Sequence, residues 1–387
     1  MAQDKPGQTG RVDNVSMGKI RVLVVDDAVV VRRMVSDVIA ADPALELAGV
    51  AANGKIALAK IPQVNPDIVT LDIEMPEMNG LETLAAIRKQ YPRLPVLMFS
   101  TLTQRGAAST IDALTLGAND YVTKPANVGS VTEALASLRE QLIPKIKMWC
   151  LRTTRTEAAP PPAAAKPVAA NVAPTAPPRG GLVSVVAIGV STGGPNALAA
   201  LLPQIPGNLP VPIVIVQHMP PVFTKMLAER LDSQCELEVH EGAAGDELRP
   251  GHVYLAPGGS HMTVKRQGVA MRVQTNQEPP ENSCRPAVDV LFRSVVDVYG
   301  SGTLGVILTG MGQDGLRGCE RIREAGGQIV AQDEATSVVW GMPGFVSRAG
   351  LADQVLPLEQ IAGELVRRVR RGRGESPAVP GKTLARC

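Results

Sequence analysis

The sequence is divided by a segment whose composition is unsuited to a packed core. Residues 158–178 contain 7 Pro and 9 Ala among 21 residues, without apolar periodicity. This composition is typical of an extended, solvated linker. The parts of the 387-residue chain on either side are each long enough for a core of their own. We therefore expect a first domain at residues 19–143 and a second domain at residues 182–372, joined by a flexible linker at residues 144–181. Residues 1–18 and 373–387 are expected to be a disordered start and a disordered tail.

Apolar β-branched runs alternate with helical patterns before the linker. The runs are IRVLVVDD, DIVTLD, PVLMFS and DYVTK. Such alternation predicts a parallel sheet covered by helices, and thus a doubly wound α/β domain. Between the first two runs, VVVRRMVSDVIAA carries an apolar stripe at helical spacing. We expect this helix to pack on the sheet through Val31, Met34, Val35, Val38 and Ile39.

The same signature returns after the linker, in VSVVAIGV, VPIVIVQH, TLGVILTG and GGQIVAQD. The second domain is therefore also predicted to be a doubly wound, Rossmann-like α/β sheet. In its middle, HVYLAPGGSHMTVKRQGVAMRVQ has short apolar runs separated by PGGS and RQG. We interpret this stretch as antiparallel hairpins that are inserted into the sheet or lie at its edge.

The composition of the chain argues against several classes of binding partner. The net charge is only +2 and aromatic residues make up 3% of the chain, so nothing in the bulk composition indicates a nucleic-acid partner. The arginines of residues 367–373 are interpreted as a solvated cationic helix end. Five scattered cysteines lack the spacing of a zinc or redox motif and indicate reduced thiols. No apolar run has the length of a membrane span, so we expect no membrane insertion and a cytoplasmic location.

Polar side chains end each of the four runs of the first domain. They are Asp26 with Asp27, then Asp72, Ser100 and Lys124. The carboxyl ends of parallel strands share one edge, where open α/β folds bind ligands. Three carboxylates gathered there repel one another unless a hard cation such as Mg²⁺ is bound. A carboxylate beside Mg²⁺ is a suitable phosphoryl acceptor, with the lysine and the serine hydroxyl as partners of the transferred oxygens.

The alternative is that Asp26 and Asp27 are only N-cap and first-turn acids of a helix, and that Lys124 is a solvated loop charge. Against it, VVDD, TLDIEMPEMNG, FSTL and YVTKP occur in this order across residues 20–143, a pattern that resembles the response-regulator receiver family. The resemblance implies a flavodoxin-like fold and phosphorylation of Asp72 by a histidine kinase. It further implies that the phosphoryl group is sensed by Ser100 and Lys124, and that Mg²⁺ is held by Asp26, Asp27, Asp72 and the backbone carbonyl of Glu74.

A glycine-rich turn, GVSTGGP, follows the first strand of the second domain and opens a helix. The free amides and dipole of a helix N-terminus suit an oxyanion, so Ser191 is a candidate nucleophile, although it could equally be an N-cap or part of a phosphate-binding turn. A serine hydroxyl needs a base, and the chain has only four histidines. His218 ends VPIVIVQH and shares the carboxyl edge with Ser191, whereas the other three lie in or near the hairpin stretch.

Two acids compete to orient this histidine. Asp314 lies in the glycine-rich TGMGQDG after one strand, and Asp333 follows the next strand. We favour Asp314 because its flanking glycines allow close approach of other backbone. The literal G-x-S-x-G also fits the α/β-hydrolase elbow, but that fold has several strands before its serine and a Ser, acid, His order. Here the order is Ser191, His218, Asp314.

With IVQHMPPVFT, CRPAVDVLF, GVILTGMGQDG and QDEATSVVWGMPG, residues 182–371 resemble the catalytic domain of the chemotaxis protein-glutamate methylesterase/protein-glutamine glutaminase family. The resemblance implies Ser191 as nucleophile, His218 as general base and acid and Asp314 as orienting carboxylate. Thr192 and the Met311 backbone amide would line the oxyanion site. The implied reaction is hydrolysis of glutamate γ-methyl esters on methyl-accepting chemoreceptors, without a cofactor, with deamidation of receptor glutamines as a second activity.

Together the two halves predict a hydrolase under phosphorylation control. A tethered receiver is present at high local concentration and could cover the serine edge until Asp72 is phosphorylated. A rival hypothesis is a response regulator whose second domain only binds receptors, with Ser191 and His218 idle. Removing the serine hydroxyl separates the two hypotheses, since only an enzyme would lose turnover.

Overall fold

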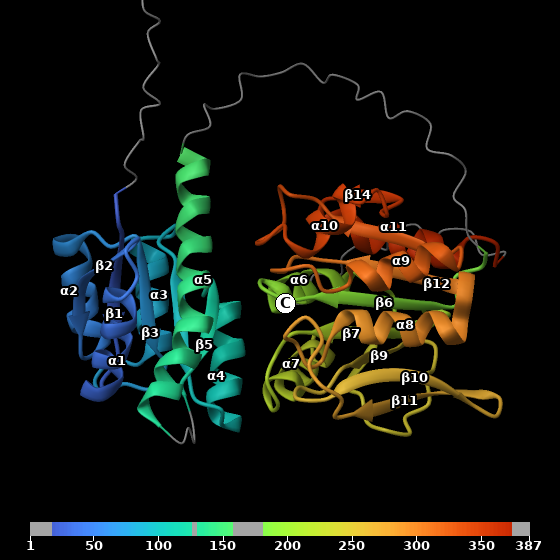
Figure 1. Ribbon diagram of the computed structural model, residues 1–387, viewed down its shortest axis with the longest axis horizontal. Helices are drawn as coiled ribbons and strands as arrows, with labels where there is room; N and C mark the ends of the chain where they lie inside the picture. The colour runs from blue at the N-terminus through green and yellow to red at the C-terminus, as the bar shows by residue number, and fades with distance from the viewer. Residues whose placement is uncertain (1–17, 126–129, 158–180, 374–387) are drawn as a thin grey trace, which may run out of the picture.

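The computed structural model describes residues 18–125, 130–157 and 181–373 and contains two α/β domains (Figure 1). Most of the predicted disordered ends, and the predicted linker from 158 to 180, lie outside the described residues. The two predicted doubly wound sheets are confirmed.

The first domain has a five-stranded parallel sheet in the order β2-β1-β3-β4-β5, the flavodoxin-like order that was expected. Its strands are β1 (Ile20–Val25), β2 (Leu45–Ala51), β3 (Ile68–Asp72), β4 (Val96–Ser100) and β5 (Asp120–Thr123). Its helices are α1 (Val29–Ala40), α2 (Gly54–Val64), α3 (Gly80–Gln90), α4 (Gln104–Thr115) and α5 (Val131–Glu157).

Helices cover both faces of this sheet, because each helix has one apolar stripe to bury. Helices α1 and α5 pack on one face, and α2, α3 and α4 on the other. From the predicted stripe of α1, Val35, Val38 and Ile39 are buried, and Val31 and Met34 pack partly buried against the same cluster.

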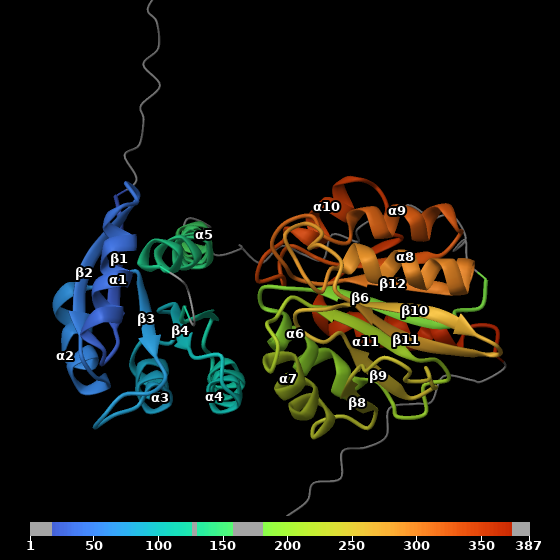
Figure 2. The same ribbon diagram turned by 60° about the horizontal axis from the view of Figure 1, so that its bottom comes forward.

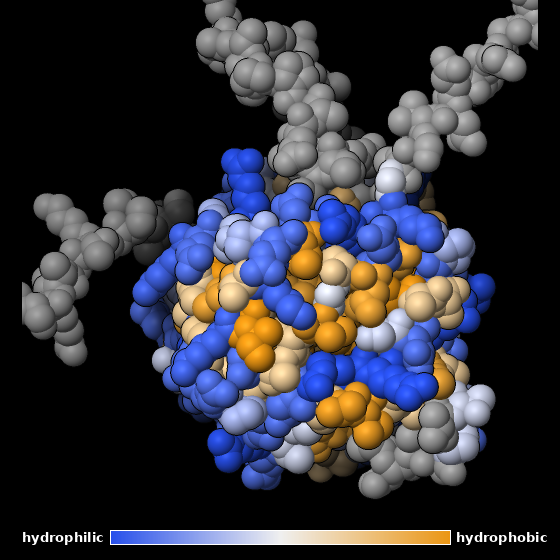
Figure 3. All heavy atoms as spheres, turned by 90° about the vertical axis from the view of Figure 1, so that its left-hand side faces the viewer, coloured by the Kyte–Doolittle hydropathy of each residue, from blue (hydrophilic) through white to orange (hydrophobic). Residues whose placement is uncertain are grey.

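Two features of the first domain differ from expectation. Helix α5 continues to Glu157 with Pro144 inside it, so the linker does not begin at 144 as predicted. Strand β2 was not predicted; it lies at the sheet edge with Leu47 and Val50 partly exposed, which removes the continuous apolar signal of a buried strand. Figure 3 views the domain from this outer side and shows hydrophobic surface interspersed with hydrophilic surface.

The second domain has a seven-stranded sheet in the order β14-β13-β12-β6-β7-β9-β8 and a separate two-stranded sheet. Its strands are β6 (Val185–Val190), β7 (Ile213–Gln217), β8 (Glu238–Glu241), β9 (His252–Leu255), β10 (His261–Gln267), β11 (Ala270–Asn276), β12 (Thr303–Ile307), β13 (Gln328–Gln332) and β14 (Gln354–Leu356). Its helices are α6 (Gly194–Leu201), η1 (Leu202–Gln204), α7 (Phe223–Asp232), α8 (Val288–Tyr299), η2 (Gly300–Gly302), α9 (Leu316–Glu324), α10 (Met342–Arg348) and α11 (Leu358–Arg370).

The hairpin prediction is only partly right. β10 and β11 form an antiparallel pair, and Figure 2 shows this hairpin lying over the large sheet. The HVYL run is instead strand β9, which pairs in parallel with β7 and β8 inside the large sheet. The PGGS segment is therefore a connection between two sheets and not a hairpin turn.

The first domain lies against the side of the second where α6 and α7 begin (Figures 1 and 2). Helix α4 contacts both α7 and α6. At this interface the rings of Tyr121 and Phe223 stack, with centroids 5.1 Å apart and planes 14° from parallel. Arg230 and Asp112 form an ion pair at 3.6 Å. The interface has an apolar centre, because the buried cluster of the α2, α3, α4 face continues into that of α6, α7 and α11.

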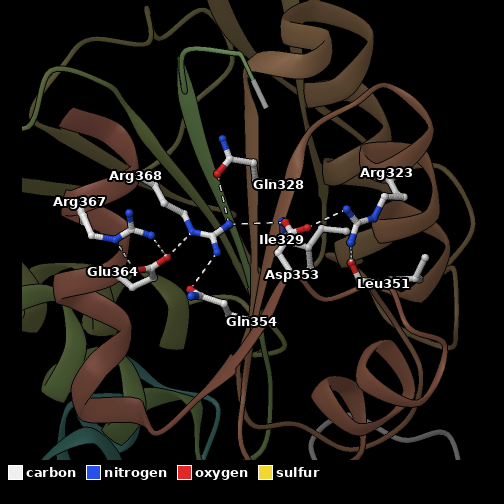
Figure 4. Close-up of polar contacts among 9 residues, drawn as sticks. All are labelled: Arg323, Gln328, Ile329, Leu351, Asp353, Gln354, Glu364, Arg367 and Arg368. Atoms are coloured by element: carbon white, nitrogen blue, oxygen red, sulfur yellow. Dashed lines mark hydrogen bonds and ion pairs between the residues drawn. The ribbon is translucent and has the colours of Figure 1, made fainter. Parts of the chain in front are cut away.

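The arginines near the end of α11 contribute to the fold. Arg368 is 5% exposed and lies among Glu364, Asp353, Gln328 and Gln354, which accept hydrogen bonds from its guanidinium (Figure 4). Arg367, Arg370 and Arg373 also have partners. The expected solvated helix end is thus wrong for Arg368, whose charge is paired and buried. Among the described helices, none is both long and apolar enough to cross a membrane.

Candidate active site and phosphoacceptor site

The three aspartates of the first domain converge as predicted. Asp26 and Asp27 follow β1 and Asp72 ends β3, the neighbouring strand. One carboxylate oxygen from each lies within 4.8 Å of the other two. Asp27 and Asp72 line a cavity of about 220 Å³, together with Glu74 and Lys124. Oxygen ligands grouped in this way suit a hard divalent cation, so the residues present fit Mg²⁺.

Lys124 neutralises part of this negative charge. Its Nζ lies 2.7 Å from Asp72 Oδ2 and 2.9 Å from Asp26 Oδ2. Burial nevertheless raises the pKa of Asp72 to about 6, with Asp26 adding repulsion and Lys124 opposing the rise. Two buried carboxylates therefore share one ammonium, and the site has a deficit of positive charge.

The predicted phosphoryl-sensing hydroxyl is directed toward helix α4. Ser100 Oγ donates to the Gly106 carbonyl at 3.0 Å and accepts from Thr110 Oγ1 at 2.7 Å. Ser100 is 1% exposed and ends β4, next to Asp72 on β3. The Glu74 side chain forms an ion pair with Arg105 at 3.5 Å.

Ser191 follows β6, the central strand of the large sheet, and lies where the strand order reverses direction. Its turn depends on glycine. Gly193 has φ of +79°, and an added Cβ would lie 2.5 Å from Val338. An added Cβ at Gly194 would overlap the Gln217 side chain. The tight turn leaves Ser191 Oγ without a hydrogen bond to any described residue, whereas its amide donates to the Thr309 carbonyl at 3.0 Å.

His218 follows β7, the strand beside β6, and Val190 is paired with Gln217. Ser191 and His218 are therefore equivalent positions on strands about 4.8 Å apart. His218 Nε2 lies 2.8 Å from Asp314 Oδ2, and Asp314 comes from the loop after β12, on the other side of β6. Three adjacent strands thus bring together the serine, the histidine and the acid. Because Nε2 faces the acid, Nδ1 is the ring nitrogen that points away from Asp314.

Asp314 is buried and saturated with donors. Besides His218, the Val288 amide donates to Oδ2 at 2.7 Å, and the amides of Asp289 and Gly315 each donate to Oδ1 at 3.0 Å. Burial alone would raise the pKa of Asp314, but the hydrogen bonds from His218 and from the Val288 and Asp289 amides lower it. The start of α8 therefore keeps this carboxylate ionised.

Asn282 was not identified from the sequence. Its side-chain amide donates to Asp314 Oδ1 and to Asp289 Oδ2, both at 2.9 Å. Asp289 is 1% exposed, and burial raises its pKa to about 6, with the Gly318 amide opposing the rise and Asp314 adding to it. Asn282 thus bridges two buried carboxyl groups and holds Asp314 in line with the imidazole.

Cys284 is the second residue that sequence reasoning missed. Its Sγ lies 3.5 Å from His218 Nδ1, so the thiol contacts the nitrogen that faces away from Asp314. Burial opposes the positive charge on His218, but hydrogen bonds to Asp314 and Cys284 outweigh burial and raise its pKa to about 9. The quoted motif CRPAVDVLF begins at this cysteine, but no spacing in the sequence places it beside His218.

The predicted oxyanion residues border the serine turn. A Cβ on Gly310 would lie 2.9 Å from Ser191 Cβ, so the residue before Met311 is in contact with the serine. The Met311 amide donates no hydrogen bond within the described part of the chain. The Thr192 carbonyl accepts from Thr309 Oγ1 at 2.9 Å, which fixes the turn. A free amide beside a candidate nucleophile is suited to a developing oxyanion.

The competing candidates lie elsewhere. Asp333 accepts from the Thr336 amide and hydroxyl at 2.9 and 2.6 Å, an arrangement typical of a local turn. His261 is fully buried and bonds to Pro279 and Ala287. His240 and His252 lie on β8 and β9 around Tyr254.

Comparison with known proteins gives matches to both domains. Residues 22–136 match the response regulator receiver domain family, and residues 186–365 match the CheB methylesterase family. A protein from Trichodesmium erythraeum named protein-glutamate methylesterase/protein-glutamine glutaminase is 56% identical, with 91% of this chain and 100% of that protein covered. A Nocardioides protein of the same name is 52% identical, with 92% and 97% covered. The crystal structure of the Thermotoga maritima CheB methylesterase catalytic domain is 46% identical and covers 48% of this chain and 98% of that chain, with a TM-score of 0.47.

Proposed function

The chain belongs to the protein-glutamate methylesterase/protein-glutamine glutaminase family, and from this premise we propose how its residues carry out and control the reaction. The proposed substrates are glutamate γ-methyl esters on the cytoplasmic helices of chemoreceptors. The products are glutamate and methanol. The observation that carries the proposal is the 2.8 Å contact between His218 Nε2 and Asp314 Oδ2, one strand away from Ser191.

Acylation begins with Ser191 Oγ attacking the ester carbonyl carbon, while His218 Nδ1 takes the hydroxyl proton. Asp314 accepts from Nε2 and stabilises the imidazolium that forms. The resulting oxyanion receives a hydrogen bond from the Met311 amide and lies near the start of α6, whose dipole favours negative charge. Methanol then leaves with the proton from Nδ1, and the receptor glutamate remains esterified to Ser191.

In deacylation His218 Nδ1 takes a proton from water, and the hydroxide adds to the acyl carbon. Collapse of the second tetrahedral species returns the proton to Ser191 Oγ and frees the glutamate. The same steps convert a receptor glutamine to glutamate with release of ammonia. An amide nitrogen is a poorer leaving group than methoxide, so we expect the ester to be the faster substrate.

Methanol release from methylated receptor membranes tests the catalytic assignment. Wild-type protein should release methanol, and Ser191→Ala should not, although Ser191→Ala should still bind the membranes. If Ser191→Ala released methanol at the wild-type rate, the nucleophile assignment would be wrong. Receptor binding without any turnover by the wild type would favour the rival hypothesis of an idle binding module.

For the first domain, we propose that a histidine kinase phosphorylates Asp72, with Mg²⁺ held by Asp26, Asp27, Asp72 and the Glu74 carbonyl. When bound, Mg²⁺ supplies positive charge that neutralises the transferred phosphoryl oxygens. Lys124 contacts two of the carboxylates and is placed to bind one of those oxygens.

The proposed control acts through α4. When the Ser100 hydroxyl turns to a phosphoryl oxygen on Asp72, its hydrogen bonds with Thr110 and Gly106 on α4 are lost. Helix α4 also contacts α6 and α7, which begin just beyond Ser191 and His218. Release of α4 would therefore uncover the serine edge. A small-molecule phosphodonor with Mg²⁺ should raise the esterase rate of wild type but not of Asp72→Asn, and equal stimulation of both would contradict this control.

A further inference from the structure

A closed turn holds Cys284 beside His218, the candidate base. The turn Glu281–Cys284 closes on itself through two backbone hydrogen bonds, at 2.9 and 3.1 Å. Its centre holds Asn282 and Ser283 at φ of +52° and +62°, a strained conformation for residues with a Cβ. Arg293 anchors the turn through a bidentate ion pair with Glu281, at 2.6 and 2.7 Å. Cys284 is therefore held against His218 by a fixed backbone.

The spacing of the two side chains matches a tetrahedral zinc chelate. Zinc binds cysteine sulfur at about 2.3 Å and histidine nitrogen at about 2.0–2.1 Å, which places the two ligand atoms about 3.5 Å apart in a tetrahedron. The Cys284 Sγ to His218 Nδ1 distance is 3.5 Å. A zinc ion could therefore bind both atoms with little movement of either side chain.

Asp314 completes the arrangement from the opposite side of the ring. Histidines that bind zinc donate their second ring N–H to a carboxylate, which fixes the tautomer and makes the ligand nitrogen more basic. Asp314 Oδ2 accepts from His218 Nε2 at 2.8 Å. Ligand atoms of His218, Cys284 and Asp314 all lie within 4.8 Å of one another. Asp314 is thus an outer-shell partner, and water would fill the remaining coordination positions.

We propose that Cys284 Sγ and His218 Nδ1 form an inhibitory Zn²⁺ site in which metal binding and general-base catalysis exclude each other. This inference rests on the proposed role of His218, since Nδ1 is the atom that would accept the Ser191 proton. When the zinc–sulfur and zinc–nitrogen bonds form, the proton on Sγ passes to solvent, as does the proton on Nδ1 when the imidazole is charged. The ion would then block turnover whatever the state of the receiver domain.

The other described cysteines serve as references. Burial raises the pKa of Cys150 to about 12 and the pKa of Cys235 to about 11. Burial also raises the pKa of Cys319 well above its ordinary value. Within the described residues, none of these three belongs to a group of metal-ligating side chains. Cys235 is partly exposed, like Cys284, and so provides a matched control.

The test uses full-length protein stripped with a chelator, with excess Mg²⁺ present to occupy the carboxylate cluster of Asp26, Asp27 and Asp72. Co²⁺ is the optical probe, because a cobalt–thiolate bond gives a charge-transfer band, and Zn²⁺ affinity follows from competition with a chromophoric chelator. Wild type and Cys235→Ala should show the band and bind one Zn²⁺ with equal affinity. Cys284→Ala should lack the band and bind Zn²⁺ at least about 100-fold more weakly. A wild type without the band, or Cys284→Ala with unchanged zinc affinity, would overturn the proposal.

Methanol release supplies the second readout, with each variant compared with its own metal-free rate. Zn²⁺ should inhibit wild type and Cys235→Ala, and Cys284→Ala should resist the same concentration. Zinc binding that leaves wild-type turnover intact would contradict the inhibitory role. If no variant released methanol, the proposed function would fail while the optical test still decided whether the metal site exists.

Discussion

Asp72 and Asp314 are both buried aspartates at the carboxyl edge of a parallel sheet, yet their environments act in opposite directions. Asp72 shares Lys124 with Asp26, and burial raises its pKa to about 6. Asp314 receives hydrogen bonds from His218, Asn282 and three backbone amides. Burial alone would raise its pKa, but the bonds from His218 and from the Val288 and Asp289 amides lower it. The comparison teaches that the number of donors, rather than burial, decides which carboxylate is charged and fixed. The negative charge left around Asp72 suits a proposed phosphoacceptor, because a bound cation can neutralise it. The donors around Asp314 suit a proposed orienting acid, because they already balance its charge and fix its position.

The largest effect should follow from removing the charge of Asp314. In Asp314→Asn the side chain keeps its size but does not stabilise the imidazolium, and its amide favours the wrong tautomer of His218. We expect kcat to fall by about 10⁴-fold with little change in KM, measured by methanol release. Asp333→Asn is the matched control and should retain activity. Comparable losses in the two variants would show that Asp314 is not the orienting acid.

Removing one donor to Asp314 should have a smaller effect. Asn282→Leu deletes the amide that bridges Asp314 and Asp289, so the carboxylate can shift relative to the imidazole. A shift of this kind costs about 100-fold in kcat. Asn208→Ala, which removes only a surface hydrogen bond to Arg370, is the control. Asn282→Asp should not restore activity, because it places a third carboxylate beside Asp314 and Asp289. Full activity in Asn282→Leu would show that the amide has only a structural role.

Weakening the interface between the domains should have a smaller effect, and it should raise the rate of methanol release rather than lower it. Tyr121→Ala removes the stack on Phe223, and an aromatic pair of this kind contributes about 0.5–1.5 kcal/mol. Without the phosphodonor, the variant should release methanol about two- to tenfold faster than wild type. Its fully phosphorylated rate should match wild type. An unchanged basal rate would mean that this contact does not hold the receiver over the serine edge.

The pH dependence of the esterase should reflect the charge on His218. Its pKa is raised to about 9 in the free protein, and the base must be neutral, so kcat/KM should rise with pH through that value. For stability the sign is reversed: the contribution of the charged imidazole is complete below about 6.5 and is lost as pH rises through about 9. In Cys284→Ala, the rising limb of the rate profile should move to lower pH. A limb that stayed in place would show that the thiol does not influence the base.

Much of the architecture could be predicted because buried parallel strands are continuous apolar runs and their carboxyl ends share one edge. This reasoning brought Asp26, Asp27 and Asp72 together and placed Ser191 beside His218. It failed for β2, β8 and β14, which are short or lie at sheet edges and lack a buried signal. It misassigned β9, because the glycines after HVYL resemble a hairpin turn.

Within the candidate site, Asn282 and Cys284 could not be found from the sequence. They reach Asp314 and His218 through a turn with two left-handed residues, anchored by Arg293 on α8. No local periodicity records where such a turn folds back, because its position is set by tertiary contacts. The donors to Asp314 from the start of α8 were equally invisible, since Val288 and Asp289 act there through their backbone amides.

The contrast between the two aspartates is tested most directly by thermal unfolding of full-length Asp72→Asn and Asp314→Asn at neutral pH without divalent cations. The ionised Asp72 costs stability as pH rises through about 6, so Asp72→Asn should stabilise the first domain by roughly 1–3 kcal/mol. Asp314 contributes stability that is lost only as pH falls through its lowered pKa, so Asp314→Asn should destabilise the second domain by about 1–3 kcal/mol. Opposite signs are the predicted result, and destabilisation by both substitutions would contradict the account.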